Sequence, residues 1–233
     1  MSYGPVDRPV GGPVPPSVRN LAAAVSVLLV AAAAVDVLTV WAGVNLYGHL
    51  GSALTGRTDR VDAAHVLDMA GNVQIGAVLV TGVVFIAWFY RARVNAEYFA
   101  QDVCTMARGW AIGAWFVPIG NLWLPYRVAS EMWQASAQST SDGSWRTVSK
   151  APVNAWWALV IASVVVGRVG SAATDAATTL AGLRHAVALT ALGDLLNAVA
   201  AVLAIVFVRR LTRMQQASHR FADTTAVEPW PTP

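Results

Sequence analysis

The sequence predicts an all-α protein, a bundle of four transmembrane helices with a Trp- and Pro-rich segment between the second and third spans. Of its 233 residues, 56% are hydrophobic and only 12% are charged, and the mean hydropathy is +0.51. A soluble domain carries about 25% charged residues. So few charges cannot cover the surface of a soluble protein, which excludes a soluble enzyme and a disordered chain and leaves a multi-pass membrane protein.

Four apolar runs supply the spans, because a helix needs roughly 20 apolar residues to cross about 30 Å of hydrocarbon. The predicted spans are residues 21–46, 69–90, 153–173 and 186–208. Together they define a membrane domain over residues 20–210. The Pro/Gly-rich head, residues 1–19, is expected to be disordered, and residues 211–233 read as a basic helix end followed by a disordered tail.

A fifth apolar run, residues 109–126, contains Pro118, Asn121 and Pro125. Four spans with a cytoplasmic N-terminus place twelve basic residues inside and three outside, whereas five spans give seven inside and nine outside. The excess of basic residues on the cytoplasmic side favours four spans. We therefore expect residues 109–136 to be re-entrant or interfacial, with both termini cytoplasmic and the chain in the plasma membrane.

Tryptophan is concentrated in one part of the chain: eight of the ten Trp residues fall between Trp88 and Trp157. Trp is enriched where one side of its ring is apolar and the other is wet. This predicts a belt at the cytoplasmic interface made of Trp110, Trp115, Trp123, Trp133, Trp156 and Trp157. The alternative is ordinary packing inside a Trp-rich bundle.

Two stretches, FIAWFYRARVNAE at residues 85–97 and RGWAIGAWFVPIGNLWLPYRVASEMWQAS at residues 108–136, carry a resemblance. They resemble the domain-of-unknown-function family numbered 4328, found mostly in actinobacteria. The matching residues are Tyr90, Arg91, Arg93, Asn95, Ala96, Glu97, Trp110, Trp115, Phe116, Pro118, Asn121, Leu122, Trp123, Pro125, Trp133 and Ser136. The resemblance extends over about residues 20–210 and is specific only at residues 85–136. It implies a multi-pass membrane protein and no particular activity.

The motif residues allow two interpretations. Arg93 and Glu97 share a helix face and are spaced to pair, either as part of a cytoplasmic site for a lipid head group or partner, or at a helix end that snorkels. Arg127 and Glu131 have the same spacing, which favours an interfacial elbow over a re-entrant pathway. We expect Asn121 to hydrogen-bond backbone groups that the neighbouring prolines leave free.

Five polar residues fall within the predicted spans. At 1.5 Å per residue from the cytoplasmic side, Asp36 and Arg168 lie at about 22 Å, Asp194 at about 21 Å and Gln74 at about 24 Å, with Asn197 one turn deeper. The common depth predicts that Arg168 pairs with Asp36, Asp194 or both. Such a cluster is either an ion pair that fixes helix register or an outward-facing pocket for a cation or anion.

Residues that carry catalysis or bind metals form no recognisable pattern. His49, His65 and His185 fall on the predicted outer side with Asp62 nearby, but without a compact ligand motif, so we expect no metal and no cofactor. The sequence has no phosphate loop, no GxGxxG and no Gly-x-Ser-x-Gly. Cys104 has no flanking histidine and reads as a packing residue. An enzyme is therefore the weakest interpretation.

Two functions remain. The first is a membrane-embedded interaction or accessory protein that recognises lipid or protein through its cytoplasmic Trp/Arg surface. The alternative is a small-solute or ion transporter or channel that uses the intramembrane polar residues. The expected partners are the lipid bilayer and a membrane protein or a second copy of the chain. Nucleic acid is not expected, because the net charge of +3 reports the loop asymmetry of a membrane protein.

Overall fold

Four long helices dominate the computed structural model, which describes residues 17–51, 56–137 and 148–225. They are α1 (Arg19–Gly51), α2 (Arg57–Phe99), α5 (Ala151–Ala176) and α6 (Leu180–Thr225). Each is long and apolar enough to cross a membrane, which confirms the predicted four-helix architecture. The predicted disordered head, up to residue 16, and the end of the tail, residues 226–233, lie outside the described residues.

Two of these helices are much longer than the bilayer requires. The 43 residues of α2 and the 46 residues of α6 each extend over more than 60 Å at about 1.5 Å per residue. About 30 Å of that length suffices for the hydrocarbon core. The last turns of α2, which contain the RARVNAE stretch, therefore continue the second span beyond its apolar part.

The segment between α2 and α5 folds into short pieces. They are the 3₁₀ helix η1 (Gln101–Val103), α3 (Trp110–Gly113), the 3₁₀ helix η2 (Gly120–Leu122) and α4 (Leu124–Ala137). The fifth apolar run thus forms no spanning helix, as the charge asymmetry predicts. The turn between α3 and η2 contains Pro118 and holds the β-branched Ile119 at φ 62°, a left-handed conformation that costs about 1–3 kcal/mol.

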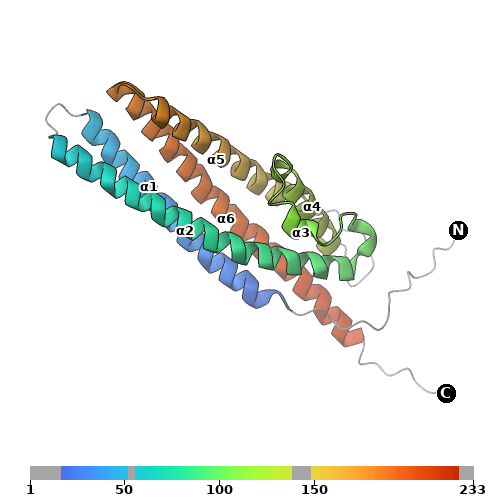
Figure 1. Cartoon of the computed structure of the whole chain (residues 1–233). Helices are drawn as coiled ribbons and strands as arrows, with labels where there is room; N and C mark the ends of the chain where they lie inside the picture. The colour runs from blue at the N-terminus through green and yellow to red at the C-terminus, as the bar shows by residue number, and fades with distance from the viewer. Residues whose placement is uncertain (1–16, 52–55, 138–147, 226–233) are drawn as a thin grey trace, which may run out of the picture.

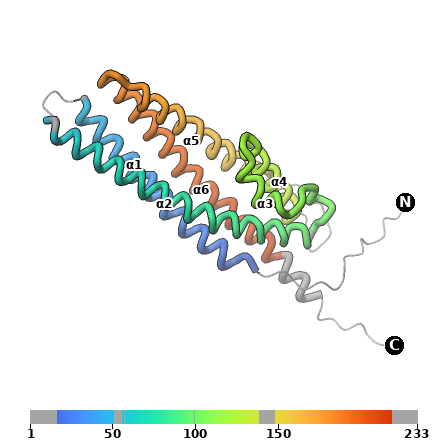
Figure 2. Tube along the Cα trace, viewed as in Figure 1, coloured from blue at the N-terminus to red at the C-terminus, as the bar shows by residue number. Residues whose placement is uncertain are grey.

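The long helices pack in the order α2, α1, α6, α5, and α4 docks against α2, α5 and α6 near one end of the bundle (Figure 1; Figure 2). We call this end the α4 end.

Helices α5 and α6 approach closely through glycines. A Cβ atom on Gly170 would lie 2.8 Å from the backbone nitrogen of Thr190, and one on Gly193 would lie 3.0 Å from Cα of Gly167. Small residues at such contacts are typical of helix packing in lipid.

The largest core lies at the α4 end, where α1, α2, α4, α5 and α6 all contribute. Its largest fully buried apolar side chains are Trp88, Trp133, Phe89, Phe207, Met132, Leu211, Val18, Val25, Val128 and Val153. Towards the other end many apolar side chains are exposed, such as Val83 at 71% and Leu79 at 65%. Exposed Val and Leu side chains over this length fit a lipid-facing surface and not a soluble one.

Single cysteines test the orientation expected from the basic residues. In a Cys104→Ser background we place one cysteine at Thr178, in the α5–α6 turn, or at Gln101, after α2; both positions are exposed. Because basic residues concentrate on the cytoplasmic side, an impermeant thiol reagent should label Thr178→Cys in intact cells and Gln101→Cys only after permeabilisation. Labelling of Gln101→Cys in intact cells would reverse the orientation.

Candidate functional site

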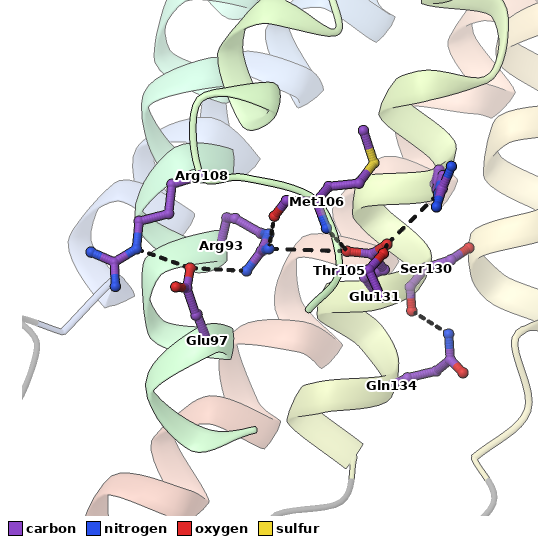
Figure 3. A network of polar contacts seen from close by, with 9 residues as sticks. Arg93, Glu97, Thr105, Met106, Arg108, Ser130, Glu131 and Gln134 are labelled. Carbon is purple, nitrogen blue, oxygen red and sulfur yellow. Dashed lines mark hydrogen bonds and ion pairs between the residues drawn. The ribbon is translucent and has the colours of Figure 1, made fainter. Parts of the chain in front are cut away.

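The RARVNAE stretch points one of its arginines into the protein. Arg93 is 0% exposed, whereas Arg91, two residues earlier, lies on the surface. The Arg93 guanidinium is 3.3 Å from a carboxylate oxygen of Glu97, donates a hydrogen bond to the backbone carbonyl of Met106, and lies 4.0 Å from Glu131 of α4 (Figure 3). The predicted Arg93–Glu97 pair is therefore confirmed, in a buried setting.

Glu131 fastens the loop before α3 to helix α4. Its carboxylate accepts hydrogen bonds from the hydroxyl of Thr105 at 2.5 Å and from the backbone nitrogen of Met106 at 3.2 Å (Figure 3). Arg127, one turn earlier, lies 3.7 Å away, which confirms the second predicted pair. Because Glu131 is only 7% exposed, these partners take the place of water around its carboxylate. We call Arg93, Glu97, Thr105, Met106 and Glu131 the arginine clasp.

One exposed residue extends the arginine clasp to the surface. Arg108 donates a hydrogen bond of 2.9 Å to the same Glu97 oxygen that faces Arg93. This hydrogen bond, together with the Glu97 charge, raises the pKa of Arg108 above its ordinary value. Because the Arg108 side chain is 56% exposed, solvent screens this outer pair and the buried contacts carry more of the stabilisation.

Most of the predicted Trp belt is inside the protein. Trp133, Trp156 and Trp157 are between 2% and 8% exposed, and Trp115 is half-buried, so packing describes these four. Trp156 and Trp133 each stack on Phe207, at 4.9 and 6.0 Å between ring centroids. Only two of the six are exposed, Trp110 at 39% and Trp123 at 53%. These six residues therefore do not form the predicted interfacial belt.

The prediction for Asn121 is wrong. Its side chain is exposed and makes no hydrogen bond within the described residues. The turn leaves few backbone groups for it to satisfy: the backbone nitrogen of Asn121 donates to Val117, and that of Trp123 donates to Gly120. The elbow is instead held from α5, where the Trp157 indole donates to the carbonyl of Leu122 at 2.8 Å.

The sequence interpretation missed one buried polar residue, Gln215. It lies in the basic end of α6, yet it is 0% exposed and donates hydrogen bonds to the carbonyl of Ala92 at 2.9 Å and to the hydroxyl of Ser136 at 3.2 Å. It thereby joins α6 to α2 and α4. The signal was its spacing, since Gln215 continues the buried face of α6 one turn after Leu211.

Near the middle of the long helices, polar side chains from α1, α2 and α6 meet. The Gln74 side-chain nitrogen donates to Asp36 at 2.7 Å and to Asp194 at 2.9 Å. Asn197 donates to the second oxygen of Asp36 at 2.9 Å, and Asp36 is only 1% exposed. The structure thus brings together four of the five predicted intramembrane polar residues. We call Asp36, Gln74, Asp194 and Asn197 the carboxylate cluster.

The fifth residue, Arg168, does not join them, and its predicted ion pair is wrong. Its side chain is exposed, and no ion pair connects it to Asp36 or Asp194 within the part of the chain that the structure describes. The reason is the packing of α5. Gly167 and Gly170 occupy the face that contacts α6, which turns Arg168 away from the bundle. Its long side chain can then snorkel towards the headgroups.

A cavity of about 240 Å³ adjoins the carboxylate cluster. It lies among α1, α2, α5 and α6, on the side facing the α4 end, and its lining is mostly apolar. Asn197 belongs to both the cavity wall and the carboxylate cluster. Among the described residues, no group of three His, Cys, Asp or Glu side chains is placed to hold a metal ion.

The fold defines a multi-pass helical membrane protein with two buried polar clusters. The arginine clasp pairs opposite charges, whereas no basic side chain among the described residues pairs with the aspartates of the carboxylate cluster. The family model described as a domain of unknown function, DUF4328, matches residues 54–213. The chain belongs to this family, as the resemblance at residues 85–136 indicates. No curated protein and no solved structure matches the chain.

Cys104 offers a test of the packing around the arginine clasp. Burial raises the pKa of its thiol from 9.0 to about 11, although nearby Arg93 acts in the opposite direction. At pH 8 the reactive thiolate should therefore be about a hundredfold scarcer than for an ordinary thiol. With iodoacetamide, Cys104 of the purified protein should react about a hundredfold more slowly than Gln101→Cys in a Cys104→Ser background. Equal rates would show that the loop is open.

Proposed function

We propose that the chain binds a small cation inside the membrane, at the carboxylate cluster, and serves as a transporter or channel for a small solute or ion. The observation that carries this proposal is the arrangement around Gln74. One neutral amide nitrogen lies within 2.9 Å of an oxygen from each of two carboxylates. A neutral amide cannot balance two negative charges, and among the described residues no basic side chain pairs with either aspartate.

The electrostatics of the membrane interior support a cation at this place. Ionisable residues inside spans are expensive and normally have a partner of opposite charge. Here Asp194 has one carboxylate oxygen, Oδ2, that is buried without a hydrogen-bond partner in the described part of the chain. A cation placed between Asp36 and Asp194 would balance the charge and use this oxygen.

An interaction or accessory role is the second proposal, and Arg168 is what favours it. Within the family motif Arg93 and Trp133 are buried, and the exposed aromatic side chains are Trp110, Phe116 and Trp123, none of which carries a charge. Arg168, by contrast, places an exposed charge within a span, on the side of α5 away from the bundle. An acidic residue on a helix of another membrane protein, or of a second copy, would compensate it. Neither proposal assigns a catalytic step to the chain.

Thermal unfolding of the full chain in nanodiscs tests cation binding. We would titrate Li⁺, Na⁺, K⁺ and methylammonium chlorides at pH 7. At least one should raise the unfolding temperature saturably, because a ligand at a hundred times its Kd stabilises the folded state by about 2.7 kcal/mol. Asp36→Asn and Asp194→Asn should abolish this shift, and the exposed Asp68→Asn should keep it.

The proposal fails if none of the four cations stabilises the wild-type protein, or if the two Asn variants respond as the wild type does. Proteoliposomes then separate transport from binding alone. A current induced by the stabilising cation and lost in Asp194→Asn supports the transporter. Stabilisation without current would favour the accessory role.

A further inference from the structure

The cavity beside the carboxylate cluster continues it along the same helix faces. Ala32 lines the cavity one turn from Asp36, and Val78 lines it one turn from Gln74. Residues four apart on a helix lie on one face, so the polar and apolar walls adjoin. Along α6 the cavity extends from Asn197 to Ala204, about 10 Å at 1.5 Å per residue.

The other end of the cavity is aromatic. Phe85, Trp115 and Trp156 line it, and the Phe85 ring contacts both Trp rings, with centroid distances of 5.7 Å to Trp115 and 5.9 Å to Trp156. The lining is therefore negatively charged at one end and aromatic at the other, and a single small molecule can reach both ends. An elongated ligand with one charged and one apolar end matches that change.

Thr81 adds a polar group inside the cavity. It lines the wall and is only 7% exposed, yet its hydroxyl has no hydrogen-bond partner within the described residues. Elsewhere in the spans, Thr39 and Thr190 donate their hydroxyls to the backbone carbonyl one turn earlier. The Thr81 hydroxyl is open to the cavity, so a ligand with a hydrogen-bonding group near its middle can bond to it.

We propose that the cavity and the carboxylate cluster form one site for an organic amine that carries an aromatic ring. Its ammonium group takes the place of the Gln74 side-chain nitrogen between Asp36 and Asp194, and its ring lies against Phe85, Trp115 and Trp156. This rests on the proposed function, since it names the class of cation. The volume of about 240 Å³ lies just below that of common ligand pockets, about 300–1,000 Å³, and limits the apolar part to a single ring on a short linker.

A lipid acyl chain is the competing occupant of an apolar space in a membrane. It carries no positive charge and no hydrogen-bond donor, so it leaves Thr81 and the two carboxylates as they are. The amine is favoured because its charge complements the aspartates at one end of the cavity while its ring matches the aromatic walls at the other. A probe of the same shape without the positive charge distinguishes an amine site from a site for a lipid acyl chain.

Two glycines of α2 provide a matched pair of variants. Gly82 lines the cavity, and a Cβ atom added there meets nothing within 4 Å, so the Gly82→Leu side chain starts in open space at the cavity wall and takes up part of its volume. Gly76 lies on the same helix, is exposed, does not line the cavity and has equally open space around it. Both changes remove a helical glycine, so Gly76→Leu controls for the effect on helix stability.

The measurement is quenching of intrinsic Trp fluorescence, since Trp115 and Trp156 line the site. The probes are 3-phenylpropylamine, its uncharged analogue 3-phenylpropanol, and n-propylamine, each titrated into the full chain in nanodiscs. 3-Phenylpropylamine should bind at least about tenfold more tightly than either analogue. Gly82→Leu should weaken it by about tenfold or more, and Gly76→Leu should leave it unchanged.

Two results would overturn the inference while leaving the proposed function standing. One is equal binding of the amine and the alcohol, which indicates a lipid-like apolar site. The other is unchanged binding of the amine in Gly82→Leu. The proposed function fails separately, if Asp36→Asn and Asp194→Asn alter neither amine binding nor the stabilisation by small cations.

Discussion

The guanidinium of Arg93 is the group around which the segment between α2 and α5 is arranged. A positive charge at 0% exposure is tolerated only when carboxylates and carbonyl oxygens surround it. Glu97 comes from the same helix, Met106 from the following loop and Glu131 from α4, so satisfying Arg93 brings three parts of the chain together. The docked loop and α4 then cover the stacked rings of Trp133, Phe207 and Trp156. Arg93 thus acts together with the Trp157–Leu122 and Gln215–Ser136 hydrogen bonds and the buried side chains of α4 to hold this segment against the bundle.

The carboxylates among α1, α2 and α6 do not have partners of opposite charge in the described part of the chain. There Asp36 and Asp194 share one amide nitrogen and have no basic partner among the described residues. The same bundle therefore contains a buried arginine that is paired with carboxylates, and a pair of carboxylates that has no basic partner among the described residues. A compensated, buried group stabilises structure and offers little to a ligand, whereas an uncompensated group in a low dielectric attracts a cation. This contrast is why the proposed function rests on the carboxylate cluster and not on the family motif.

The fold was largely predictable, and the site only in part. Hydropathy predicted the four spans, and the distribution of basic residues predicted that the fifth apolar run does not cross the membrane. Both predictions depend only on composition along the chain. The spacing of Arg93 and Glu97 predicted a pair, but spacing tells only which residues share a face and not what covers it. Arg168 shows the same limit. Its depth follows from 1.5 Å per residue, while its direction depends on glycines that set how α5 meets α6.

A double-mutant cycle between Arg93 and Glu131 measures whether the buried arginine of the motif holds α4 in place. The free energy of unfolding would be measured in detergent for Arg93→Met, Glu131→Gln and the double variant, with the exposed Arg91→Met as a control. We expect Arg93→Met to lower the free energy of unfolding by about 3–5 kcal/mol. The double variant should recover at least about 0.5 kcal/mol of the summed loss, and Arg91→Met should be near neutral. Strict additivity, with Arg93→Met no more harmful than Arg91→Met, would show that the buried arginine does not hold α4 in place.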